Sequence, residues 1–164
     1  TGVEGWRVEK LGLVTAVAVD PQGTFVAVGT PGAVVVLNLA DGAELRRLGP
    51  FAAPVSAVAV SPDGRWIAAG DDAGAVRVWP AGADKPQFTL AGHAGGVRSL
   101  AVKDGGRWVL SGGADRTLRL WDTAAPKPDA AVFRKHAAAV TGAAFLANGT
   151  QTVSGDGALV ALPW

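Results

Sequence analysis

Two groups of residues in this sequence combine the side chains that hydrolytic or metal chemistry requires. Each group holds a histidine, a serine and an aspartate; the members are His93, Ser111 and Asp115, and His136, Ser154 and Asp156. A histidine that contacts a hydroxyl and is oriented by a carboxylate is the arrangement of a serine hydrolase triad. Histidine and carboxylate are also ligands that zinc accepts. Catalysis and metal binding therefore have to be weighed against a structural role.

The surrounding sequence argues against both kinds of chemistry. A nucleophilic serine of the elbow type lies in a Gly-x-Ser-x-Gly segment, and the chain has none. The chain has no Cys and only two His, and no carboxylate stands at ligand spacing from His136. We therefore predict no catalytic residue, no metal site and no cofactor, and we assign both groups a structural, hydrogen-bonding role.

The elements that must position these residues come from a repeat that runs through the chain. Four alternating apolar runs, residues 14–19, 55–60, 97–102 and 140–145, start 41, 42 and 43 residues apart. A repeat of about 40–45 residues is typical of the four-stranded blades of a β-propeller. Each run is followed by a turn rich in residues such as Gly, Pro, Asp and Asn, which accept turn geometry.

Three further strands are predicted in each repeat. Their segments are short, β-branched and closed by Gly or Pro, which excludes helices. The second strands are 25–28, 66–69, 108–111 and 151–154, the third 34–37, 76–79, 118–121 and 159–162, and the fourth 46–48, 88–90 and 131–133. A matching fourth-strand segment, residues 6–8, opens the chain. The apolar runs are nearly continuous, as expected for sheets that are covered on both faces.

These strands predict an all-β fold with four blades, each a four-stranded antiparallel sheet. The whole chain, residues 1–164, is predicted to form one propeller unit, with repeats at about 3–40, 41–80, 81–122 and 123–164. Tryptophans recur at the spacing of the blades: Trp66 matches Trp108, and Trp79 matches Trp121. Recurrence at this spacing indicates that these rings pack between blades and do not form a ligand-stacking surface.

Composition narrows the classes of partner. The 15 basic and 14 acidic residues give a net charge of +1 and form no block, which argues against a nucleic acid partner. No apolar run approaches the roughly 20 residues of a membrane-spanning helix, so no membrane partner is predicted. Without Cys there are no disulfides; a cytoplasmic location is favoured, although nothing in the sequence fixes the compartment. The absence of Met favours a chain trimmed or cut from a longer one.

The third repeat resembles the WD-repeat family of β-propellers. It starts with Gly92-His93, ends with Trp121-Asp122, and carries a Ser-Gly pair and an Asp between them. The resemblance implies a WD-type propeller that is a non-catalytic scaffold for protein–protein interaction. It also implies a hydrogen-bonded tetrad of His, Ser or Thr, Asp and Trp in each blade. Carried over to this sequence, the full tetrad would be His93, Ser111, Asp115 and Trp121.

The other repeats depart from that pattern. The fourth keeps His136, Ser154 and Asp156 but has Leu162-Pro163 in place of the Trp-Asp pair, so it would hold a partial tetrad. In the second repeat the four positions read Phe51, Ala69, Ala73 and Trp79, and the first repeat has Lys10, Val28 and Leu37 at such positions. Blades 1 and 2 are therefore expected to rely on apolar packing.

Four blades are too few for the rings of seven or eight that the resemblance implies. Blades of about 45° turn through half a circle in one chain, so we expect a homodimer that closes one eight-bladed ring. The chain opens with a fourth strand and ends with a third, so its opening strand would complete the last blade of the partner. The expected seam residues are Trp6, Val8, Leu159, Leu162 and Trp164.

Other forms of closure remain open at the level of sequence. Four blades of about 90° would close a ring within a single chain, whose opening strand would then complete its own last blade. The chain could also be a fragment of a longer single-chain propeller of seven or eight blades. A third alternative is an engineered or reconstructed half-propeller whose only activity is assembly.

The resemblance places partner binding on the loops that enter the first strands and on the loops between second and third strands. At these positions the sequence has Arg98, Asp72, Arg116, Ser56 and Thr141. Charged side chains on an otherwise small-residue face are the groups expected to give specificity. We therefore expect other proteins or peptides to bind this face, in addition to the second copy at the seam.

Overall fold

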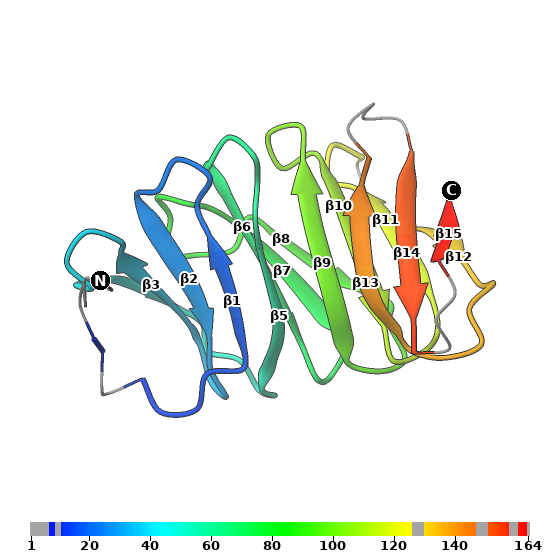
Figure 1. The fold of residues 1–164 in the computed structure, drawn as a ribbon, viewed down its shortest axis with the longest axis horizontal. Coiled ribbons are helices and arrows are strands. Elements are labelled where there is room, and N and C mark those ends of the chain that lie inside the picture. The colour runs from blue at the N-terminus through cyan, green and yellow to red at the C-terminus, as the bar shows by residue number, and fades with distance from the viewer. Residues whose placement is uncertain (1–6, 9–10, 126–129, 147–150, 158–160, 164) are drawn as a thin grey trace, which may run out of the picture.

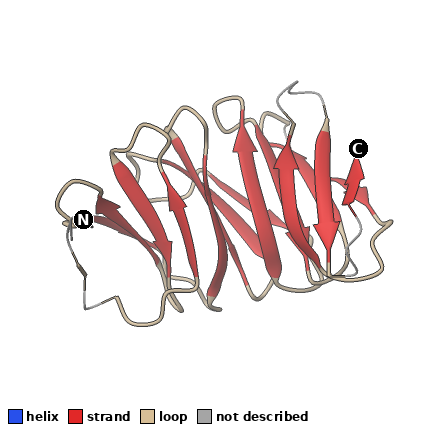
Figure 2. Cartoon of the chain, in the orientation of Figure 1, coloured by secondary structure: helices blue, strands red, loops and turns tan. Residues whose placement is uncertain are grey.

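The structure is a computed structural model that describes residues 7–8, 11–125, 130–146, 151–157 and 161–163; for 161–163 only the backbone is described. Within these residues the regular structure consists of fifteen strands and contains no helix (Figure 2). The strands form four antiparallel sheets in chain order, three of them four-stranded. The all-β architecture expected from the sequence is therefore confirmed, and each sheet is one blade.

The strand bounds follow the predicted repeat. Blade 1 holds β1 (Ala16–Val19), β2 (Phe25–Gly29), β3 (Val34–Asn38) and β4 (Glu44–Leu48). Blade 2 holds β5 (Val55–Val60), β6 (Trp66–Asp71), β7 (Ala75–Pro80) and β8 (Phe88–Ala91). Blade 3 holds β9 (Val97–Lys103), β10 (Trp108–Gly113), β11 (Leu118–Asp122) and β12 (Ala130–Phe133). Blade 4 holds β13 (Val140–Phe145), β14 (Thr152–Asp156) and β15 (Ala161–Pro163).

Two predicted strands differ from the structure. The first strand of blade 1 was expected to begin at Val14, but β1 begins at Ala16. The opening segment, residues 6–8, was expected to be a strand; its described part, Arg7 and Val8, lies in no sheet. Both differences concern the end of the array where no blade precedes blade 1, so backbone and side chains there lack the neighbour that would hold them extended.

The turns between first and second strands explain why the apolar runs stop where they do. In blade 1 the Asp20 carboxylate accepts hydrogen bonds from the backbone N–H of Thr24 at 3.1 Å and of Gln22 at 3.2 Å. Gly23 and Gly64 close the turns of blades 1 and 2 with φ of 71° and 69°, which a glycine adopts without steric cost. These turns fix the register of the first two strands in each blade.

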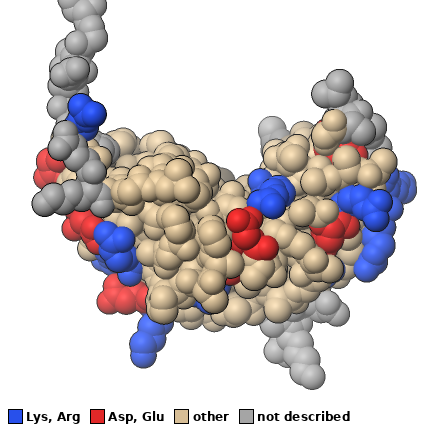
Figure 3. Space-filling model, turned by 90° about the horizontal axis from the view of Figure 1, so that it is seen from below, with Lys and Arg blue, Asp and Glu red and all other residues tan. Residues whose placement is uncertain are grey.

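The four blades stand side by side as an open arc. Figure 1 shows the first strands β1, β5, β9 and β13 next to one another on the near side, with blades 1 and 4 at opposite ends. Figure 3 shows the arc from below, hollowed on one side between its two shoulders. The chain therefore does not close on itself as a four-bladed ring in this structure.

The core consists of apolar layers between successive blades. One layer packs Ala27, Val34 and Val36 of blade 1 against Val55 and Ile67 of blade 2. Equivalent layers lie between blades 2 and 3 and between blades 3 and 4. Because the inner blades are covered on both faces, their strands are apolar at nearly every position, which is the pattern seen in the sequence.

Candidate functional site

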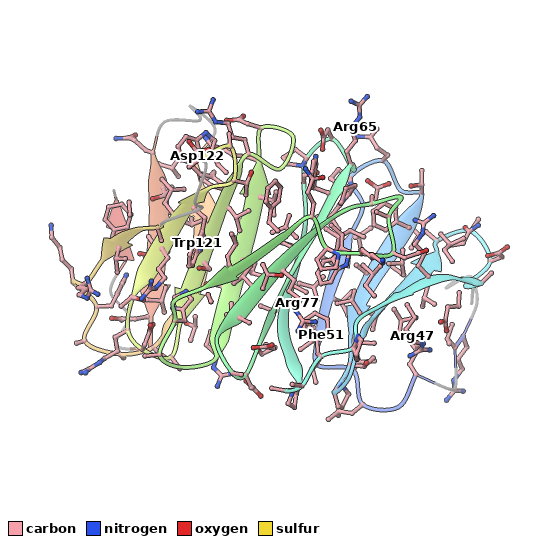
Figure 4. The ribbon with its side chains drawn as sticks, turned by 180° about the vertical axis from the view of Figure 1, so that it is seen from behind. Arg47, Phe51, Arg65, Arg77, Trp121 and Asp122 are labelled. Carbon is pink, nitrogen blue, oxygen red and sulfur yellow. The ribbon has the colours of Figure 1, made fainter. Side chains whose placement is uncertain are left out.

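The structure brings the four predicted tetrad residues of blade 3 together in one hydrogen-bonded chain. His93 Nε2 lies 2.8 Å from the hydroxyl of Ser111, and His93 Nδ1 lies 3.0 Å from both carboxylate oxygens of Asp115. Trp121 Nε1 donates to the same hydroxyl of Ser111 at 2.8 Å. Thr117, which sequence reasoning missed, donates its hydroxyl to Asp115 at 2.8 Å. Figure 4 shows Trp121 on its strand, β11, seen from behind.

The geometry assigns the protons along this chain. The ionised Asp115 carboxylate can only accept, so His93 Nδ1–H donates to it. In a neutral ring Nε2 then accepts from the Ser111 hydroxyl, whose oxygen accepts from Trp121. Burial lowers the pKa of His93 and outweighs the hydrogen bond and charge of Asp115, which raise it. Burial raises the pKa of Asp115, but hydrogen bonds with His93, Thr117 and the N–H of Ala94 outweigh it and lower the pKa to about 2. The network is therefore a neutral histidine between a hydroxyl and a carboxylate.

Local sequence explains how these groups reach one another. His93 precedes β9, Ser111 lies on β10, and Asp115 lies in the turn that leads to β11. A Cβ atom at Gly113 would stand 2.4 Å from His93 Nδ1 and 2.6 Å from Asp115 Oδ1, so the glycine leaves the space in which the two side chains meet. Glycine at this position is thus a requirement of the hydrogen-bonded network.

Blade 4 builds a similar contact from a different register. His136 Nδ1 lies 2.9 Å from Asp156 Oδ2, and Nε2 lies 2.6 Å from the hydroxyl of Ser154. Asp156 pairs with Val140 in the sheet, and the residue that pairs with the corresponding Val97 in blade 3 is Gly113. The carboxylate therefore comes from the position where blade 3 has its glycine, and not from the position of Asp115.

Blade 2 replaces the tetrad with rings and a cation. Trp79 is fully buried, and its indole Nε1 has no hydrogen-bond partner, because Ala69 stands at the position of the serine. The Phe51 ring lies 5.8 Å from the Trp79 ring, and the Arg77 guanidinium stands 4.5 Å from the Phe51 centroid. Figure 4 shows Arg77 and Phe51 beside each other. Blade 2 thus leaves the buried Trp79 donor unsatisfied.

The blade 3 network cannot serve as a hydrolytic centre in this geometry. Ser111 has no exposed surface, and its hydroxyl contacts both His93 and Trp121. A nucleophile must reach a substrate carbonyl within bonding distance, which burial of the hydroxyl prevents. No group of three or more His, Cys, Asp or Glu side chains in the described part of the chain could hold a metal ion. The polar groups of these residues are engaged in hydrogen bonds that stabilise blade 3.

The residues expected to form a partner-binding face have different surroundings. Arg98 of β9 pairs with Asp72 of the preceding blade at 2.6 Å, and both side chains are exposed. Ser56 donates its hydroxyl to the carbonyl of Val97 at 2.6 Å and so links blades 2 and 3. Thr141 is exposed at the start of β13, the first strand of blade 4.

Arg116 belongs to a pocket that the sequence did not indicate. It is exposed with φ of 65°, and it lines an open hollow of about 390 Å³ together with Asp115, Thr117, Arg134 and His136. The hollow thus joins the turn between β10 and β11 to the segment that leads into β13. Arg134 follows β12 in the segment that enters β13; sequence reasoning considered this class of loop but did not select Arg134. Two arginines, Arg116 and Arg134, thus line the same hollow.

The seam residues can be followed only in part. Val8 packs against the apolar cluster on the outer face of blade 1, which contains Val26, Val28, Val35 and Leu37. In this single chain Val8 thus covers its own blade 1 and does not complete its own blade 4, the arrangement expected for a closed monomer. The backbone of Leu162 pairs with Ser154 in β14. Trp6, Leu159 and Trp164 lie outside the described residues.

One finding in the structure bears on the prediction of no membrane partner. Among the described residues, no helix has the length and hydropathy that crossing a bilayer requires.

Comparisons with known proteins point to one family. The family model described as "WD domain, G-beta repeat" matches residues 42–80 and 84–122. Each matched segment holds the fourth strand of one blade and the first three strands of the next, so repeat and blade are offset by one strand. No curated protein matches the chain.

The solved structures agree with the family model. A chain in "Crystal Structure of Mitotic Checkpoint Complex" superposes with a TM-score of 0.80 at 25% identity, over 92% of this chain and 46% of that one. The present chain thus spans about half the length of that chain. In all, 1133 chains match, so the fold alone does not select a partner. The matched segments identify WD40 repeats at residues 42–80 and 84–122, and these lie within an array of four antiparallel sheets of the same kind.

Proposed function

We propose that this chain is a non-catalytic scaffold for protein–protein interaction whose loop face binds peptide segments of other proteins. The observation that supports this most directly is the satisfied, buried state of its reactive side chains. The side chains of the two His–Ser–Asp groups are engaged in hydrogen bonds, one group within blade 3 and the other within blade 4. The exposed loops therefore remain as the surface available for function. The two WD40 repeats support the same conclusion, because WD40 propellers are interaction scaffolds.

The hollow beside Arg116 suggests the chemistry of the segment that binds. Arg116 and Arg134 stand at its rim, and a guanidinium pair favours a carboxylate because it can donate paired hydrogen bonds. Asp115 at the same hollow already accepts hydrogen bonds from His93 and Thr117, so its oxygens are engaged within the blade. An acidic side chain or a carboxyl terminus of a peptide is the ligand that fits.

A library of displayed peptides tests this function. Selection on the wild-type protein should enrich acidic peptides, and Arg116→Glu should weaken an enriched peptide by about tenfold or more, measured by fluorescence anisotropy. Arg65→Glu is the matched control, because Arg65 is an exposed arginine in the turn between β5 and β6, at the other end of the strands. Equal losses in both variants would attribute the binding to overall charge and refute the site.

We propose further that two copies close one eight-bladed ring by exchange of the N-terminal strand. Two features support this part of the proposal: the open arc, and the match to less than half of a longer chain. Light scattering should give about twice the 16.5 kDa chain mass at micromolar concentration.

A monomeric mass would favour the second candidate, in which these blades are half of a longer single-chain propeller of seven or eight blades. The 46% coverage of the similar chain is compatible with that candidate as well. An engineered half-propeller with assembly as its only activity would give the dimer mass and enrich no peptide. Mass and peptide selection together therefore separate the three proposals.

A further inference from the structure

One contact recurs at every junction between blades. The second strand of each blade ends near a glycine, and the first strand of the next blade begins with a valine that rests on it. A Cβ atom added at Gly29 would lie 2.9 Å from Cγ1 of Val55, and one added at Gly112 would lie 2.6 Å from Cγ1 of Val140. At Gly70 the distance to Cβ of Val97 would be 2.5 Å. The missing side chain is therefore the socket into which the valine fits.

The three valines depend on this socket for burial. Val55, Val97 and Val140 each begin the first strand of their blade, and each is 0% exposed. In blades 2 and 4 the valine pairs with an aspartate across a β-bulge, Asp71 and Asp156 respectively. Docking on the preceding blade and extension of the first strand thus occur together at every internal junction.

The repeated valine and glycine positions continue to both ends of the array. At one end the valine lacks a glycine to pack on, and at the other end the glycine lacks a valine. Val14 stands one repeat before Val55, and Gly155 stands one repeat after Gly112. Val14 is 45% exposed and lies outside any strand, and β1 begins two residues later, at Ala16. Blade 1 therefore presents a valine without a socket.

The rest of the blade 1 face follows the same rule. Val17 and Val19 of β1 are 56% and 53% exposed. Their counterparts in blade 2, Val58 and Val60, pack in the layer between blades 1 and 2. The first-strand part of this face is thus an apolar ridge that is covered at the internal junction and open at the end.

The outer face of blade 4 has the complementary shape. Gly155 pairs with Gly142 and Ala161, and Ala144 pairs with Val153 on the same side of the sheet. A shallow, mostly apolar hollow of about 280 Å³ lies over these small residues. A Cβ atom at Gly142 would meet nothing within 4 Å, which shows that the space beside β13 is open.

We propose that the two ends of the array are the two halves of one interface, and that Val14 of one copy docks at Gly155 of a second copy. Val17 and Val19 then cover Ala144 and Val153, and β1 extends back to Val14. A twofold axis makes the contact twice and closes the ring. The occupant is a second copy because the same contact occurs three times within the chain. This inference rests on the proposed self-assembly and specifies its seam.

Two variants on opposite ends provide the test. Val14→Asp places a carboxylate at the ridge, and Ala144→Glu places one in the hollow, and neither position is buried in the single chain. Each variant alone should raise the dimer dissociation constant by on the order of a hundredfold or more, measured by sedimentation velocity. Thr89→Glu is the control, because it adds the same charge at an exposed position of β8, the fourth strand of blade 2, which belongs to neither end of the array.

Mixing the two variants gives the decisive outcome. In the mixture, the intact Val14 end of one variant meets the intact blade 4 face of the other, so a one-to-one dimer should form through a single seam. Variants that stay dimeric alone, or a mixture that stays monomeric while both variants keep the wild-type circular dichroism spectrum, would overturn the seam. If the wild-type chain itself is monomeric, the proposed self-assembly fails as well.

Gly155→Val is an additional variant that fills the proposed socket directly. Gly155→Val alone should form no dimer. Mixed with Val14→Asp it should form a dimer through one seam, in which its intact Val14 end meets the intact blade 4 face of the other variant. Wild-type dimerisation of Gly155→Val would contradict the role of the glycine.

Discussion

Trp79 and Trp121 occupy the same position in neighbouring blades, yet only one of their indole N–H groups has an acceptor. Trp121 donates to Ser111, whereas Trp79 faces Ala69 and is buried without a partner. An unsatisfied buried donor costs about 1–3 kcal/mol. Blade 2 therefore carries a local defect that one oxygen atom would repair.

Ala69→Ser should raise the free energy of unfolding by about 1 kcal/mol, because the serine hydroxyl would accept from Trp79 as Ser111 does in blade 3. Urea titration followed by tryptophan fluorescence measures the change. Ala68→Ser is the matched control: Ala68 is equally buried but is adjacent on the strand and faces the other side, so its hydroxyl should destabilise. Equal effects of the two substitutions would show that Trp79 does not use the new acceptor.

His93 gives the fold a dependence on pH. Its pKa in the folded chain is lowered from the usual value of about 6.5, so folding favours the neutral ring. The unfolded chain takes up the proton first as pH falls, which means that this stability is complete above about pH 6.5 and is lost below it. Asp115, with a pKa of about 2, stays ionised across this range.

The difference in unfolding free energy between wild type and His93→Gln should therefore be largest near pH 8 and should shrink between pH 6.5 and pH 5. The comparison cancels the contributions of the groups that the two proteins share. Thermal unfolding monitored by circular dichroism at four or five pH values measures it. A difference that stays constant over this range would mean that His93 does not remain neutral in the folded chain.

At the scale of elements, the junction between second and first strands sets how closely blades approach. Val97 is 0% exposed and packs against Gly70, where it leaves no room for a methyl group. Gly70→Ala should lower the free energy of unfolding by about 1–3 kcal/mol, because overpacking forces blades 2 and 3 apart. Urea titration measures this loss.

Gly32→Ala is the control for that substitution. A Cβ atom at Gly32 would meet nothing within 4 Å, so the change in stability should be within about 0.5 kcal/mol. A loss at Gly32 as large as that at Gly70 would attribute the effect to the backbone and not to the socket.

At the scale of the whole molecule, the blades are unequal in how they are held. Blades 3 and 4 contain buried polar networks, whereas the layer between blades 1 and 2 is apolar and aromatic. The open arc leaves blade 1 with exposed valines and blade 4 with a small-residue hollow. Closure by a second copy would remove both from water, and the melting temperature should then rise with protein concentration. Differential scanning fluorimetry from 1 to 100 μM checks this; a constant melting temperature would contradict a dimer.

The sequence by itself determined the repeat, the order of the strands and the likeness of blade 3 to a WD repeat. These features depend on local patterns: period-two alternation, turn residues at fixed offsets, and recurring His, Ser, Asp and Trp. It also indicated that blade 2 lacks its serine, since Ala69 stands where Ser111 stands one repeat later.

Only the tertiary structure decided which side chains meet. The contact of Asp156 with His136 comes from a register position different from that of Asp115, and the bond of Ser56 to Val97 crosses between blades. Strand β1 begins late and Val14 is exposed because no blade precedes it. A local pattern describes each strand alike, whereas burial depends on the neighbouring blade, and that neighbour is set by packing in three dimensions.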